Sequence, residues 1–180
     1  MTIPPLALFA GLTPWLVILC YQDCRWRRLP NVLTFGGALL ALAARYGYGG
    51  IALGNAGLFG GIVCSLFLLL PFILHSAGGG DVKMLFAVGC AIGLDRAAVA
   101  ILFISLAGLG LMLVMLFSGL ADGRRLKHYL RCVFDWRYDR KAGREKLPPK
   151  SSEKCRVPFG VAIAVGTWLS LAFEIFVVSG

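Results

Sequence analysis

Long apolar blocks constrain this chain more than any other feature of its sequence. Apolar residues make up 58% of the chain, and its mean hydropathy is +0.79. A helix that spans a bilayer needs about 20 mainly apolar residues. Six candidate segments come close to or meet that length: residues 4–22, 32–49, 56–75, 81–94, 97–119 and 157–178. The sequence therefore predicts an all-α, polytopic membrane protein with about six transmembrane helices, forming a single domain over residues 1–180.

The first and fourth segments differ from the others in how they begin. The first has no basic start and no small-residue cleavage site, so we expect it to stay as a membrane anchor. The fourth is short, and it opens with the run Gly78-Gly79-Gly80-Asp81-Val82-Lys83. A start at Ser76 makes it long enough. The glycines then form an irregular start, which a bilayer tolerates only where protein or a water-filled cavity covers the backbone.

The distribution of basic residues predicts the orientation. Of the 18 Lys and Arg residues, Arg25, Arg27, Arg28, Lys83 and the twelve between residues 124 and 156 fall on one side, and only Arg45 and Arg96 fall on the other. Cytoplasmic connections carry the excess of basic residues. Both termini are therefore expected to face outward. The net charge of +9 follows from this topology, and no nucleic-acid partner is expected.

Residues 120–156 are predicted to form one basic cytoplasmic loop. Its first part also carries Tyr129, Phe134, Trp136 and Tyr138. This composition fits an amphipathic helix on the membrane surface, held by aromatic rings and anionic lipid. A solvated loop that only obeys the charge rule remains the alternative.

The six cysteines do not indicate a metal site. They occupy positions 20, 24, 64, 90, 132 and 155, and no two form a Cys-x-x-Cys pair. We expect free thiols and packing residues, with no metal and no cofactor.

Two of the nine acidic residues stand apart from the rest. Asp23 ends the first helix and Asp81 opens the fourth, so the predicted topology places both at one membrane depth on the cytoplasmic side. An acid at the edge of the hydrocarbon is costly and indicates a functional site. Because Asp81 begins a helix, the helix dipole favours its charged form.

A carboxylate pair of this kind is suited to hydrolysis. Like charge raises the pKa of one member, so the two titrate as a unit. The ionised member then takes a proton from water, and the protonated member donates one to the substrate. From the residues alone, a proton-coupled transporter or channel with His75 as a relay remains open, as does a non-catalytic scaffold that acts through the basic loop.

Three motifs in order resemble one family. They are Asp23 followed by basic residues and Leu29-Pro30-Asn31, the Gly78-x-Gly80-Asp81-x-Lys83 segment, and the Pro158-Phe159-Gly160 start of the last helix. The chain resembles the type IV prepilin peptidases, the aspartic leader peptidases of the bacterial inner membrane. The resemblance implies removal of the short basic leader of pilin-like precursors at the cytoplasmic face.

The resemblance also implies residue roles. Asp23 and Asp81 match the catalytic pair, and Gly78, Gly80, Lys83, Pro30 and Asn31 match supporting positions. Larger members add a methyltransferase portion with paired Cys-x-x-Cys motifs, which these 180 residues lack, so no N-methylation is expected. The short form is most similar to the peptidases of Tad/Flp pilus systems, and it implies pilus assembly proteins as further partners.

Overall fold

The computed structural model describes residues 3–26, 29–73, 78–117 and 159–179. Within these ranges the ordered elements are all helices, as predicted. His75 and the basic loop 120–156 lie outside the described residues. The helices are α1 (Pro5–Trp26), α2 (Asn31–Ile73), α3 (Gly79–Ile92), α4 (Leu94–Phe117) and α7 (Phe159–Ser179).

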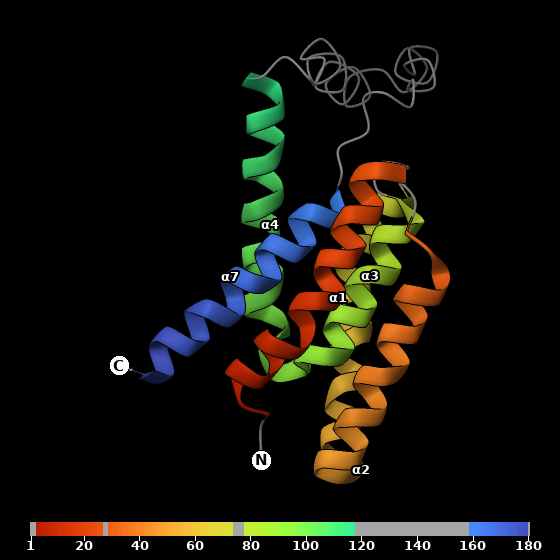
Figure 1. The fold of residues 1–180 in the computed structure, drawn as a ribbon, viewed down its shortest axis with the longest axis vertical. Helices are drawn as coiled ribbons and strands as arrows, with labels where there is room; N and C mark the ends of the chain where they lie inside the picture. The colour runs from red at the N-terminus through yellow and green to blue at the C-terminus, as the bar shows by residue number, and fades with distance from the viewer. Residues whose placement is uncertain (1–2, 27–28, 74–77, 118–158, 180) are drawn as a thin grey trace, which may run out of the picture. The chain divides into compact units, whose positions relative to one another are not determined.

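The chain divides into two compact units. One unit comprises Met1–Gly108 and Pro158–Gly180, and the other comprises Leu109–Val157. Of the second unit, the structure describes only residues 109–117, the last part of α4. The first unit holds every other described helix and both aspartates. We call the end of the first unit where α1 finishes and α3 starts the upper end (Figure 1).

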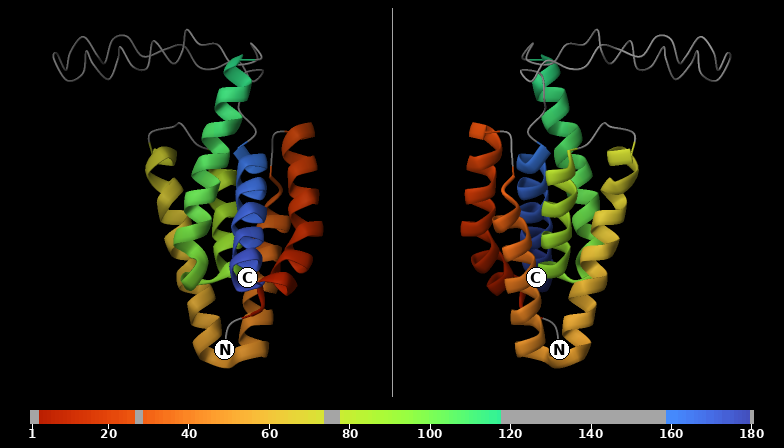
Figure 2. Two further views of the ribbon diagram at one scale, coloured as in Figure 1. Left: turned by 90° about the vertical axis from the view of Figure 1, so that its left-hand side faces the viewer. Right: turned by 90° about the vertical axis from the view of Figure 1, so that its right-hand side faces the viewer.

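Helix α2 is a hairpin of two helical arms rather than one rod. Gly49 and Gly50 have non-helical backbone angles, and Gly50 has φ of +63°, a conformation that glycine adopts without steric cost. Figure 2 shows the first arm, 31–48, running from the upper end to the lower end and the second, 51–73, returning. Two predicted segments, 32–49 and 56–75, correspond to these arms.

Within the part of the chain that the structure describes, four helical stretches are long and apolar enough to cross a membrane: Pro5–Trp26, Asn31–Leu69, Leu94–Met115 and Phe159–Val177. The second has 39 residues. At about 1.5 Å per residue it is far longer than one crossing of a hydrocarbon core of about 30 Å needs. α3 has only 14 residues and falls short of a full span. The number of crossings, which the sequence puts at about six, stays a prediction.

Helix α3 lies at the centre of the first unit. Every residue from Met84 to Ile92 is buried except Phe86, which is half-buried. A helix that is apolar on all sides belongs inside a larger structure. Although α3 is too short to span a membrane, the other helices of the first unit cover it.

Four helices of the first unit, α1, α2, α3 and α7, form two closely packed pairs. α2 packs extensively on α3, and α1 packs on α7, whereas contacts from α1 and α7 to α3 are fewer. At the α2–α3 interface, a Cβ on Gly89 would lie 2.5 Å from the carbonyl oxygen of Gly60. Small residues permit such a close approach of helix backbones in membrane proteins.

A buried arginine, Arg45, and a partly buried one, Arg96, form hydrogen bonds at the lower end. The Arg45 side chain is 2% exposed and donates from Nε to the carbonyl of Leu53 and from Nη1 to that of Ala91. Arg96 donates from Nε to both carboxylate oxygens of Glu174, at 2.8 and 2.6 Å, and from Nη2 to the Ile3 carbonyl. Buried charges need such partners. The two cations that the sequence analysis placed together on the outer side thus bind groups within the protein.

Candidate active site

The topology brings Asp23 and Asp81 to the same end of the first unit. Asp23 lies in the last turn of α1, and Asp81 is the third residue of α3. α1 runs toward the upper end and α3 runs away from it (Figures 1 and 2). The two helices contact one another. Two acids from remote stretches of the chain therefore share one end of the helix bundle.

The Asp23 carboxylate is held by the start of α7. Its side chain is buried, at 7% exposure, and its Oδ2 accepts a hydrogen bond of 3.0 Å from the main-chain N–H of Gly160. The first N–H groups of a helix have no intrahelical partner, and the helix dipole complements negative charge there. The Asp23 carboxylate, which belongs to α1, thus accepts a hydrogen bond from one of the first N–H groups of α7.

Asp81 makes a similar contact within its own helix. Its Oδ2 accepts a hydrogen bond of 3.1 Å from the N–H of Gly78, the extended residue just before α3. An acid three positions after the N-cap commonly reaches back in this way. Asp81 lies in the first turn of its own helix, whereas Asp23 lies in the last turn of α1 and meets a helix N-terminus only through its contact with α7.

The supporting residues predicted from the motifs gather around the first turn of α3. Lys83 donates from Nζ to Asn31 Oδ1 at 2.9 Å and lies over the ring of Phe35 at 5.5 Å. A Cβ on Gly80 would lie 3.2 Å from the Leu29 side chain, so the segment leading into α2 packs against α3.

Pro30 stands just before α2 rather than inside its first turn. Its carbonyl accepts the first main-chain hydrogen bonds of α2, from Leu33 and Thr34. The Thr34 hydroxyl donates to the Asn31 carbonyl at 3.2 Å. These contacts fix where α2 begins, and so where Asn31 meets Lys83.

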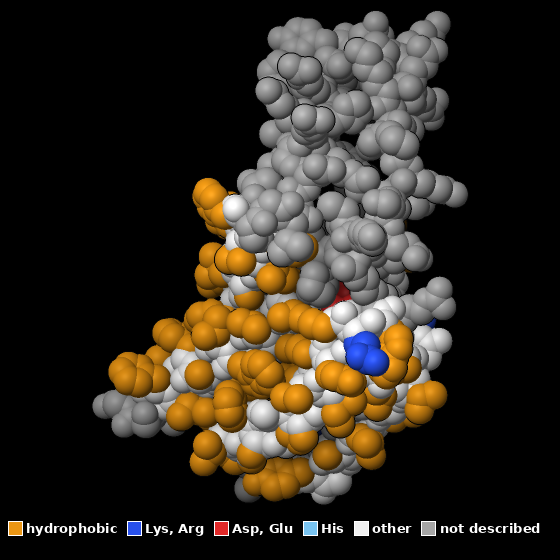
Figure 3. Space-filling model, turned by 45° about the horizontal axis from the view of Figure 1, so that its top comes forward, with side chains coloured by type: hydrophobic (Ala, Val, Ile, Leu, Met, Phe, Trp, Pro, Cys, Tyr) orange, Lys and Arg blue, Asp and Glu red, His pale blue; other side chains and the backbone are white. Residues whose placement is uncertain are grey.

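The surface around this end differs from the flanks of the molecule. On the face shown in Figure 3, apolar side chains cover most of the described surface, while a small acidic area and a basic side chain appear toward the end turned to the viewer. An apolar flank with polar groups at its end is the pattern of a membrane-embedded bundle.

Comparison with known proteins gives one match. The sequence profile of the type IV leader peptidase family matches residues 10–113, which is more than half of the chain. The chain belongs to the type IV leader peptidase family. No curated protein and no solved structure matches the chain.

Membership establishes the general role. A type IV leader peptidase is a protease that acts on pilin-like precursors, and the apolar helices agree with a membrane protein. The matched region contains both aspartates and all five supporting residues, whereas α7 lies beyond it.

The described residues of this leader peptidase contain no group of three or more His, Cys, Asp or Glu side chains that could hold a metal ion. Cys20, Cys24, Cys64 and Cys90 are free thiols.

Sequence reasoning missed one group in this leader peptidase, the Gly160 amide. The motif Pro158-Phe159-Gly160 marks the start of α7, but it gives no sign that a main-chain N–H would meet Asp23. The two residues are 137 positions apart, and a main-chain donor leaves no signature in side-chain chemistry.

Proposed function

We propose that this leader peptidase is an aspartic endopeptidase in which Asp23 and Asp81 together activate water. One observation carries the proposal: two acids from distant segments occupy the same end of one bundle, and each accepts an N–H from a glycine. Burial of a carboxylate such as Asp23 is costly, which favours a functional reason for its position.

The proposed reaction follows from general acid–base catalysis. One carboxylate removes a proton from water as it attacks the scissile carbonyl, and the protonated partner donates to the carbonyl oxygen and then to the leaving nitrogen. Two neighbouring carboxyl groups sharing one proton fulfil both roles. No covalent intermediate is needed.

The supporting residues are proposed to fix the geometry of Asp81. Gly78 supplies its N–H, Gly80 permits the contact with Leu29, and Lys83 joins α3 to Asn31. Pro30 sets the start of α2 and thereby the position of Asn31.

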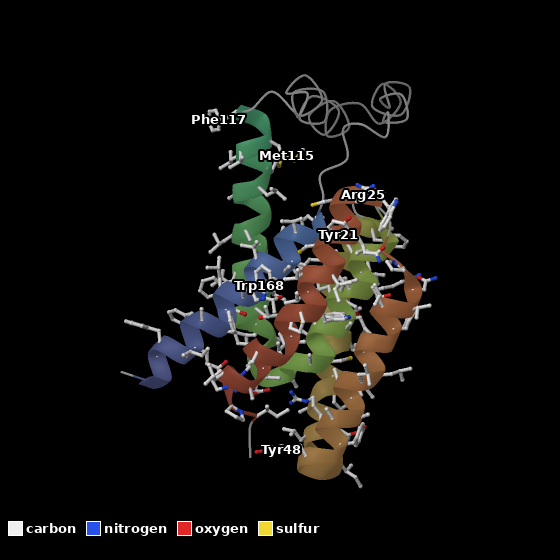
Figure 4. All side chains as sticks on the ribbon, viewed as in Figure 1. Tyr21, Arg25, Tyr48, Met115, Phe117 and Trp168 are labelled. Atoms are coloured by element: carbon white, nitrogen blue, oxygen red, sulfur yellow. The ribbon has the colours of Figure 1, made fainter. Side chains whose placement is uncertain are left out.

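We propose that the upper end faces the cytoplasm of a bacterium and that the protein lies in the inner membrane with both termini outward. Figure 4 shows Tyr21 and Arg25 toward this end of α1. Tyr21 and Trp26 are 60% and 56% exposed and stack edge to face, and Arg25 lies over the Trp26 ring. Such aromatic and basic groups favour a membrane interface.

The finer biological assignment rests on the sequence. We propose a Tad/Flp-type substrate, a short basic leader on a pilin-like precursor, and peptidase activity without N-methylation, because no Cys-x-x-Cys pair occurs in these 180 residues. Anionic lipid and pilus assembly proteins are the proposed partners of the basic loop 120–156.

The test is cleavage of a purified pilin-like precursor by Asp23→Asn and Asp81→Asn. Each variant is expected to lose at least about a thousandfold in kcat, because each removes a general acid or base. Asp95→Asn is the matched control, since Asp95 is a half-exposed acid near the start of α4 that contacts Arg96. Near-normal cleavage by either of the first two variants rules out the aspartate pair.

A further inference from the structure

We infer that Gly160 is a positioning residue for catalysis: its main-chain N–H orients the Asp23 carboxylate, and its lack of a side chain makes the approach possible. The inference rests on the proposed aspartic peptidase function. It names a residue beyond the region matched by the family profile, which ends at residue 113.

A hydrogen bond links Gly160 to Asp23. The Gly160 N–H lies 3.0 Å from Asp23 Oδ2 in a buried setting. A hydrogen bond to a charged acceptor contributes more than one to a neutral acceptor. Because α7 is a rigid helix packed on α1, the direction of this N–H fixes one carboxylate oxygen in space.

The absence of a side chain at Gly160 leaves room for the Asp23 carboxylate. A Cβ at position 160 would lie 2.7 Å from Oδ2, 3.1 Å from Cγ and 3.4 Å from Cβ of Asp23. All three of its nearest neighbours belong to Asp23. Even a methyl group at this position must therefore displace the carboxylate or the helix.

Asp81 makes a matching contact with a glycine. Gly78 donates its N–H to Asp81 Oδ2 at 3.1 Å, and a Cβ on Gly78 would lie 3.0 Å from the same oxygen. Each aspartate of the proposed pair thus accepts a hydrogen bond from the main-chain N–H of a glycine. The glycine that serves Asp81 is local in sequence, whereas the one that serves Asp23 comes from the last helix.

The test uses Gly160→Ala in the full-length protein. A displacement near 1 Å costs about a hundredfold in rate, so kcat is expected to fall about 100-fold while KM for a pilin-like precursor changes less than about twofold. Two alanine variants serve as controls. Gly36 has open space around it, and Gly36→Ala should keep normal kcat. A Cβ on Gly54, close to the turn of α2, would meet the ring of Tyr46, so Gly54→Ala should lower thermal stability without lowering the kcat of the folded protein.

A second variant separates the N–H from the space. Cys155 permits ligation of a synthetic segment 155–180 with glycolic acid in place of Gly160, which replaces the N–H by an ester oxygen and adds no side chain. We expect kcat to fall at least about tenfold, as loss of a hydrogen bond to a charged group predicts. Normal kcat in this protein overturns the positioning role, and so does normal kcat in Gly160→Ala.

Asp23→Asn is assayed beside these proteins. If it is inactive while both Gly160 changes leave kcat intact, the inference alone fails. If Asp23→Asn cleaves normally, the proposed function fails, and the positioning role falls with it.

Discussion

At the scale of single residues, Lys83 has a specific partner. Its Nζ binds Asn31 Oδ1 at 2.9 Å and lies over Phe35, so one side chain joins the first turns of α2 and α3. A lysine at a membrane interface would otherwise extend its charge toward water. The sequence analysis identified both Lys83 and Asn31 but did not predict that they would pair.

This contact predicts non-additive stability effects. Lys83→Met and Asn31→Ala should each lower the unfolding free energy, and the double variant should lose about 1 kcal/mol less than their sum, because the exposed hydrogen bond is lost only once. Thermal unfolding in detergent of the four proteins measures this coupling. Strictly additive losses would mean that the pair contributes nothing.

Residue-level chemistry was predictable where the contacts are local. The spacing between Gly78 and Asp81 is that of a helix N-cap and its third residue, so their hydrogen bond is of a local kind, although the sequence analysis did not predict it. The contact between Asp23 and Gly160 depends on how α1 and α7 pack, and nothing in the local sequence of either helix determines that packing.

At the scale of elements, the close α2–α3 interface is the feature on which the position of Asp81 depends. A Cβ on Gly89 would meet the backbone of Gly60 and Gly61, and backbone cannot move aside as a flexible side chain can. Gly89→Ala is therefore expected to destabilise the protein by about 1–3 kcal/mol, the usual cost of overpacking. Thermal unfolding checks this, with Gly36→Ala as the control. An unchanged unfolding midpoint in Gly89→Ala would contradict the interface.

The sequence predicted helical segments well and their ends less well. The predicted segments 4–22 and 81–94 correspond to the observed helices Pro5–Trp26 and Gly79–Ile92. Apolar periodicity locates a segment, but capping contacts determine where it stops. The irregular start expected at the three glycines is confined, among the described residues, to Gly78, since Gly79 and Gly80 are helical.

At the scale of the whole molecule, the proposed orientation predicts which thiols a membrane-impermeant maleimide can reach. Cys24 is exposed and belongs to the upper end, whereas Tyr48 is exposed and lies toward the lower end (Figure 4). In proteins that keep a single cysteine, Tyr48→Cys should react in intact spheroplasts, and Cys24 should react only after permeabilisation. The reverse pattern would place the aspartates on the outer face.

Charge and hydropathy predicted part of the arrangement of the helices. The basic residues and the helix order predicted that Asp23 and Asp81 would share one end, and the fold brings both there. The hydrogen-bond partners of Arg45 and Arg96 were not predictable in this way, because charge counting assigns a side of the membrane and not a partner.

The division into two helix pairs has a consequence for catalysis. One acid belongs to the α1–α7 pair and the other to the α2–α3 pair, and the connections between the pairs are sparser than those within them. The distance between the two carboxyl groups therefore depends on how the α1–α7 pair packs against the α2–α3 pair. Under the proposed function, we expect any change that moves the α1–α7 pair against the α2–α3 pair to lower kcat even where neither aspartate is altered.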